Sequence, residues 1–264
     1  MIKYTSYLFL WLLFGCASVP VSHRKQLKIV SESQLISSGA IAYQSFLDEN
    51  TVISSYNTDA VMVKRVGEKL AVACQSFLDK HGDVHRLNGF EWEFNLVEGP
   101  HINAWCMPGG KVVVYEGILS ITQDEEGLAV VLSHEIAHAI ARHGNERVSQ
   151  QMMAQYGSAA LAILFDNSSF QGMDLQNIIS DSYGAGANLG LLKFSRMHET
   201  EADKMGLVFM EYAGYDSRNA IAFWKRMSEN ANGSPPEFLS THPSDQSRIS
   251  DIEAFIPVAK SYVY

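Results

Sequence analysis

The segment Leu132-Ser133-His134-Glu135-Ile136-Ala137-His138-Ala139 decides the fold, because it sets two histidines and a glutamate in an apolar, helix-forming run. His134 and His138 are four residues apart, so in a helix they lie about 40° apart around the axis and can hold one metal ion. Glu135 follows the first histidine and can reach a water molecule on that ion. The pattern H-E-x-x-H therefore predicts a zinc site with an adjacent general base, suited to peptide hydrolysis. The alternative is a surface helix that carries these residues by chance.

The flanking residues predict that this motif lies in the middle of a helix. Thr122 and Glu125 have the spacing of a capping box, which marks a helix N-terminus. Gly144 is expected to end the helix. Arg142 and His143 come just before that end, where positive charge is favourable, and we expect His143 to have no more than a minor direct role.

A catalytic zinc site needs a third protein ligand. Glu199 and Asp203 are four residues apart in a second predicted helix, 194–213, so they share one face of it. Glu199 is predicted to complete a His, His, Glu site, and Asp203 to accept the free N–H of a ligand histidine. Glu201, about 200° round the helix from Glu199, is the alternative ligand, although it suits a charged, solvated face better.

Four motifs in combination resemble a known family. They are H-E-I-A-H at 134–138, E-T-E-A-D at 199–203, N-A-W-C-M-P-G-G at 103–110 and T-H-P at 241–243. Together they are similar to the zinc metallopeptidases typified by the CAAX prenyl protease, and most of all to their bacterial lipoprotein members. The resemblance covers roughly residues 60–255.

The resemblance implies that one Zn²⁺ ion is bound by His134, His138 and Glu199. It also implies that Glu135 is the catalytic carboxylate and that Asp203 supports a ligand from outside the metal shell. The implied fold is α+β, mainly α, with a small three-stranded sheet beside the active-site cleft.

Two more segments are candidates through the same resemblance. Asn103 and Ala104 match the strand beside the cleft and are predicted to bind substrate. His242 lies in a loop that we expect to fold over the cleft. There it would act in catalysis by stabilising the oxyanion, or would cap the metal and block water; a purely structural role is the alternative.

Alternating apolar and polar residues predict three strands near 92–96, 102–106 and 111–115, with a turn at 108–110. We predict that they form a meander with an exposed strand that accepts an extended peptide through main-chain hydrogen bonds. Helical spacing is predicted over 33–80, 146–165, 217–229 and 245–255 besides the two site helices. Residues 156–192 are predicted as packed helices rather than a membrane span, because acidic residues and glycines interrupt them.

The whole chain has 264 residues, 47% apolar and 19% charged, which is ordinary for a globular protein. Its net charge of -9 argues against a nucleic-acid partner and gives no attraction to anionic lipid.

The N-terminus has the form of a secretory signal peptide. Lys3 precedes an apolar run that ends at Phe14 and is followed by Gly15 and Cys16. This run is too short to span a bilayer.

Residues 13–16 resemble a bacterial lipobox. We therefore predict that residues 1–15 are a signal peptide and that Cys16 carries a lipid anchor on the periplasmic side; a soluble secreted protein is the alternative. Ala17, by resemblance to sorted lipoproteins, indicates the outer membrane.

Residues 16–30 are polar and mixed, and they are predicted to be a solvated tether ahead of a single metallopeptidase domain, 31–264. Its basic residues are His23, Arg24, Lys25 and Lys28. Only Cys74 and Cys106 then remain, and an exported compartment permits a disulfide between them without requiring it.

These inferences predict a zinc-dependent endopeptidase with Glu135 as general base and then general acid. The resemblance implies that its substrates are unfolded or misassembled envelope proteins. The chain lacks the many membrane spans of the eukaryotic prenyl proteases, which argues against a prenylated substrate. The alternative is a chaperone-like or binding lipoprotein whose metal site rarely cleaves.

Overall fold

The computed structural model describes residues 16–156, 194–230, 236–242 and 247–263. Within these ranges the chain is mostly helical with two small sheets, so the prediction of a mainly helical α+β fold is confirmed. The elements are β1 (Cys16–Ser18), β2 (Lys25–Leu27), α2 (Glu32–Glu49), α3 (Thr58–His81), β3 (Glu93–Val97), β4 (Ala104–Met107), β5 (Lys111–Tyr115), α4 (Leu119–Thr122), α5 (Glu125–Ala141), α6 (His143–Tyr156), α9 (Arg196–Tyr212), α10 (Asn219–Glu229), α11 (Glu237–Thr241) and α12 (Arg248–Ser261).

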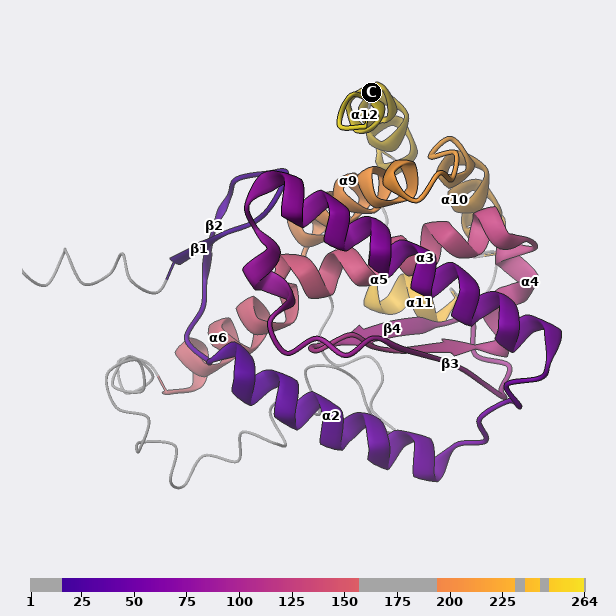
Figure 1. Cartoon of the computed structure of the whole chain (residues 1–264), viewed down its shortest axis with the longest axis horizontal. Coiled ribbons are helices and arrows are strands. Elements are labelled where there is room, and N and C mark those ends of the chain that lie inside the picture. The colour runs from indigo at the N-terminus through magenta and orange to yellow at the C-terminus, as the bar shows by residue number, and fades with distance from the viewer. Residues whose placement is uncertain (1–15, 157–193, 231–235, 243–246, 264) are drawn as a thin grey trace, which may run out of the picture.

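Helix α5 carries the H-E-x-x-H motif through the centre of the molecule, between the larger sheet and helices α3 and α9 (Figure 1). From Gly127 to Ala141 every residue except Ala139 is buried. A helix that is apolar and buried on all sides has no solvated face, so its few polar residues must find partners inside the protein.

Both predicted ends of α5 were wrong. Its N-cap is Asp124, whose carboxylate accepts the backbone N–H of Gly127 at 2.8 Å, whereas Thr122 belongs to the preceding helix α4. Its C-cap is Arg142 in the left-handed conformation, with φ 59°, and α6 begins at the next residue. Arg142 thus takes the left-handed C-cap position that we expected near Gly144, and Gly144 lies inside α6.

The larger sheet has the order β3-β5-β4, with β3 parallel and β4 antiparallel to β5. The predicted meander is therefore wrong, although its three strands exist. Alternation of side chains fixes which face of a strand is buried, and it carries no information on which strand lies in the middle. Strand β4 is left at an edge of the sheet.

The two faces of this sheet bury different residues. Phe94, Leu96 and Val114 pack into the main core, and their face is covered by α3 and α5. Trp105 faces the opposite side, where α2 covers the sheet and Phe46 packs edge-on against it at a ring distance of 5.0 Å (Figure 1). The sheet is thus buried on both faces beside the metal motif.

Helices α5 and α9 pack closely, and this contact determines the geometry of the site. A Cβ on Gly206 of α9 would lie 3.1 Å from Ser133 Oγ and 3.2 Å from the backbone nitrogen of His134. Glycine at this position therefore lets the acidic helix approach the histidine helix within van der Waals distance.

Residues 16–27 form the antiparallel hairpin β1–β2, with Val19 and Gln26 buried, so this part of the chain is not the solvated tether that we predicted for residues 16–30. The predicted signal peptide and most of residues 156–192 lie outside the described residues. Among the helices that the structure describes, none has the length and apolar character needed to cross a bilayer.

Candidate metal centre

Four buried side chains converge behind the sheet. His134 and His138 come from α5, Glu199 from α9, and His242 from the residue that follows α11. One potential ligand atom from each lies within 4.8 Å of all the others. Two of these histidines and the glutamate are the predicted metal ligands, brought together from segments more than 60 residues apart.

The separations within this cluster fit tetrahedral zinc. The Nε2 atoms of His134 and His138 are 3.0 Å apart. Each of them lies 3.3 Å from an oxygen of Glu199, His134 from Oε2 and His138 from Oε1. His242 Nδ1 lies 3.3 Å from His134 Nε2 and 3.2 Å from Glu199 Oε1. Ligand atoms about 2.0–2.1 Å from a tetrahedral zinc ion are about 3.3 Å from each other. The donor set, imidazole nitrogen and carboxylate oxygen, is also that of zinc sites.

The positions of the protons on these side chains also fit a metal ion at the centre of the cluster. Asp203 Oδ1 lies 3.0 Å from His134 Nδ1, so this nitrogen carries a proton and the lone pair of Nε2 points into the cluster. Glu199 Oε2 is buried and makes no hydrogen bond of good geometry with the described residues, although Arg248 Nη1 lies 3.2 Å away as an ion pair. Electron pairs that face one another without protons between them repel, and a cation at their centre removes that repulsion.

Arg248 of α12 holds the supporting carboxylate. Its Nε and Nη2 each donate to Asp203 at 2.8 Å, and its Nη1 lies 3.2 Å from Glu199 Oε2. The guanidinium also lies over the ring of Trp224, 3.4 Å from the ring centroid. Sequence reasoning missed Arg248, because a residue 45 positions from Asp203 on another helix has no spacing pattern to reveal it.

Glu135, the predicted catalytic carboxylate, lies beside the cluster. Its Oε1 is 3.3 Å from His242 Nε2 and makes no hydrogen bond with the described residues. Burial raises the pKa of Glu135. A buried carboxylate with a raised pKa and a free oxygen can take a proton and return it.

Glu201, the alternative ligand, points away from the cluster. Its carboxylate lies 3.0 Å from His143 Nε2 and accepts hydrogen bonds from Arg24, and the residue is only 5% exposed. The solvated face that we expected at this position is therefore wrong. His143 is also buried, with its Nδ1 2.9 Å from Nδ1 of the ligand His138.

Asn103 immediately precedes the edge strand β4, Ala104 is its first residue, and both are buried. The side chain of Asn103 accepts the backbone N–H of Ala104 at 2.9 Å, and the carbonyl of Ile102 accepts from Phe238 of α11 at 3.0 Å. Their role in substrate binding stays a prediction. Cys74 and Cys106 are free and buried, so they form no disulfide in this structure.

Comparison with known proteins gives a consistent assignment. The model of peptidase family M48 matches residues 59–256. The chain is 34% identical over 247 residues to the mitochondrial metalloendopeptidase OMA1 of Schizosaccharomyces pombe, covering 92% of this chain and 67% of that protein. It is 31% identical over 170 residues to the beta-barrel assembly-enhancing protease of Escherichia coli, covering 61% of this chain and 33% of that protein.

These matches support the zinc metallopeptidase family that the sequence motifs indicated. They do not single out the prenyl proteases or a lipoprotein branch within it. The family model includes both segments that supply the predicted ligands and the catalytic carboxylate. The chain belongs to peptidase family M48 and is a metalloendopeptidase of the H-E-x-x-H type.

Proposed function

We propose that this protein is a zinc-dependent endopeptidase that degrades unfolded or misassembled proteins of the bacterial cell envelope, attached by a lipid on Cys16, on the periplasmic side of the outer membrane. The observation that carries the catalytic part is the convergence of four buried side chains, with ligand atoms within 4.8 Å of one another, beside a carboxylate oxygen of Glu135 that has no hydrogen bond with the described residues. The substrate class is supported by the similarity to the beta-barrel assembly-enhancing proteases of Escherichia coli and Yersinia pestis.

The chain's own residues divide the chemistry between them. His134, His138 and Glu199 would hold the zinc ion, which when bound would supply a Lewis acid for the scissile carbonyl and for the activation of a water molecule. Glu135 accepts the proton of that water and then delivers it to the leaving amine. Asp203 keeps the proton of His134 on Nδ1, so that Nε2 stays available as a ligand.

His242 is the fourth side chain of the cluster in this conformation. Its Nδ1 lies among the ligand atoms and its Nε2 lies 3.3 Å from Glu135 Oε1, where water and substrate would have to enter. Of the roles we considered, capping of the metal agrees best with this position. It also favours the second candidate function, a chaperone-like lipoprotein that binds its clients and rarely cleaves them.

Substrate recognition is proposed to use the edge strand β4, which begins at Ala104, together with Asn103 just before it. An edge strand pairs with an extended peptide through main-chain hydrogen bonds, so side-chain identity matters little. This mode of binding suits a protease that acts on unfolded chains of many sequences.

The test compares wild-type protein with Glu135→Gln on casein, with zinc content measured by elemental analysis in both. We expect about one zinc ion per chain in each protein, and cleavage by the wild type alone. Glu68→Gln, an exposed change on α3, is the matched control and should cleave like wild type. The proposed catalysis would be contradicted if the wild type contained no zinc, or if wild type and Glu135→Gln cleaved casein at equal rates.

A further inference from the structure

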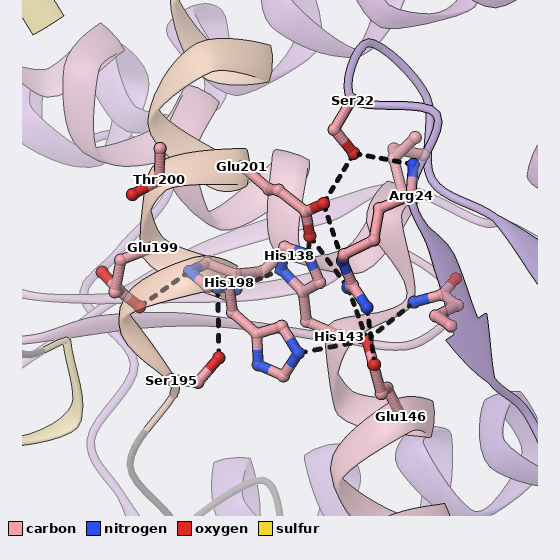
Figure 2. A network of polar contacts seen from close by, with 12 residues as sticks. Ser22, Arg24, His138, His143, Glu146, Ser195, His198, Glu199, Thr200 and Glu201 are labelled. Atoms are coloured by element: carbon pink, nitrogen blue, oxygen red, sulfur yellow. Dashed lines mark hydrogen bonds and ion pairs between the residues drawn. The ribbon is translucent and has the colours of Figure 1, made fainter. Parts of the chain in front are cut away.

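A second polar network lies behind the metal centre (Figure 2). It joins Arg24, in the turn between β1 and β2, to Glu146 of α6 and to Glu201 and His198 of α9. From this geometry we infer that Arg24, Glu201 and His143 are positioning residues for the metal ligand His138, so that the N-terminal hairpin is a working part of the metal site.

The first link runs from the ligand to His143. His138 points Nε2 at the other ligand atoms, so the proton of the neutral ring is on Nδ1. That Nδ1–H donates to His143 Nδ1 at 2.9 Å. His143 must then carry its own proton on Nε2, and it donates this proton to Glu201 Oε2 at 3.0 Å. One assignment of tautomers therefore satisfies every bond in the series.

The second link is the double salt bridge of Arg24. Its Nε and Nη2 donate to the two oxygens of Glu201 at 2.8 and 2.9 Å, and its Nη1 and Nη2 donate to those of Glu146 at 2.7 Å each (Figure 2). The Ser22 hydroxyl also donates to Glu201, at 2.6 Å. Because a guanidinium is planar and presents two bidentate edges, it fixes the direction of both carboxylates together.

The two ligand histidines are supported in parallel ways. His134 donates to Asp203, which Arg248 holds, and this acidic partner was predicted from the sequence. His138 donates to His143, which in turn donates to Glu201, the carboxylate that Arg24 holds. Partners of this kind orient a ligand ring and raise its affinity for metal, whether or not they touch the ion.

Removal of the Arg24 charge would affect this support directly. Glu146 and Glu201 are 4% and 5% exposed, and Arg24 lies between them. Without the guanidinium the two carboxylates would repel each other, and Glu201 would turn away from His143. The turn that presents Arg24 is itself strained, since Val21 and His23 have φ of 65° and 55°, which β-branched valine rarely adopts.

The inference rests on the zinc site proposed above, so the decisive measurement is zinc affinity of the full-length protein by competition with a chromophoric chelator. We expect Arg24→Gln to bind zinc about 10-fold more weakly than wild type, and Arg24→Lys to recover only part of the loss. Glu201→Gln keeps the side-chain volume and should weaken zinc by a similar factor if Arg24→Gln does not fold. The double variant should show little further loss, because both changes break one series of bonds.

The matched control is Arg65→Gln, which removes another arginine–glutamate pair, to Glu125 of α5 at 2.5 Å. It touches the helix that carries the ligands without touching the network, so its zinc affinity should equal that of wild type. Equal affinities of wild type, Arg24→Gln and Glu201→Gln would overturn the inference while leaving the proposed function intact. A wild type that binds no zinc would overturn both.

Discussion

Replacement of Asp203 by alanine tests whether the metal centre depends on its surroundings. Asp203 is buried and makes three polar contacts, one to His134 Nδ1 at 3.0 Å and two to Arg248 at 2.8 Å. Alanine removes the acceptor that fixes the proton on His134, and it leaves the buried guanidinium with one carboxylate partner fewer. We therefore expect both zinc affinity and stability to fall.

The size of each effect follows from these contacts. Loss of one partner from a buried ion pair costs about 3–5 kcal/mol. Arg248 keeps Glu199 Oε2 at 3.2 Å, so we expect a loss at the lower end, about 3 kcal/mol. For a domain of this size that loss lowers Tm by about 6–12 °C. Loss of the partner of a ligand histidine should weaken zinc binding about 10- to 100-fold.

Two assays compare Asp203→Ala with the control variant Thr200→Ala. Thermal unfolding with and without a chelator measures stability, and competition with a chelator measures zinc affinity. The control removes a hydroxyl whose one bond to the described residues is to the carbonyl of Arg196 in its own helix, so zinc affinity and Tm should both match wild type. Unchanged zinc affinity in Asp203→Ala would refute the role given to the bond with His134. If Asp203→Ala and wild type had the same Tm in the presence of chelator, the stabilisation of about 3 kcal/mol assigned to the Asp203–Arg248 ion pair would be refuted.

Three further predictions concern the same molecule. His242→Ala should raise the casein cleavage rate if His242 caps the metal and lower it if His242 stabilises the oxyanion, whereas an unchanged rate would remove it from the site. Removal of zinc by a chelator should cost about 2.7 kcal/mol relative to protein at a free zinc concentration about 100 times its Kd, measured as a fall in Tm. Burial raises the pKa of Glu146, but hydrogen bonds from Arg24 and His198 outweigh it and hold this pKa well below the ordinary 4.5. Its stabilisation is therefore complete above pH 4.5 and is lost as the pH falls below that value, so Tm of Glu146→Gln should depend less on pH in this acid range; an equally steep profile would contradict the assignment.

Local periodicity determined much of the metal centre. Four-residue spacing placed His134 with His138 and Glu199 with Asp203 on shared helix faces, and the structure brings the first three together at the metal centre and Asp203 against His134 Nδ1. The same periodicity placed Glu201 on the opposite side of its helix, which is correct. What it could not show is that this side is buried against Arg24, which is 177 residues away in sequence.

The sequence by itself thus determined which side chains share a helix face or a strand face, because these relations repeat every few residues along one element. Only the tertiary structure decided that β5 lies between β3 and β4, that Arg248 holds Asp203, and that Arg24 of the N-terminal hairpin binds Glu201. Those relations depend on contacts between distant segments, which form where complementary surfaces and charges meet and leave no regular spacing in the chain.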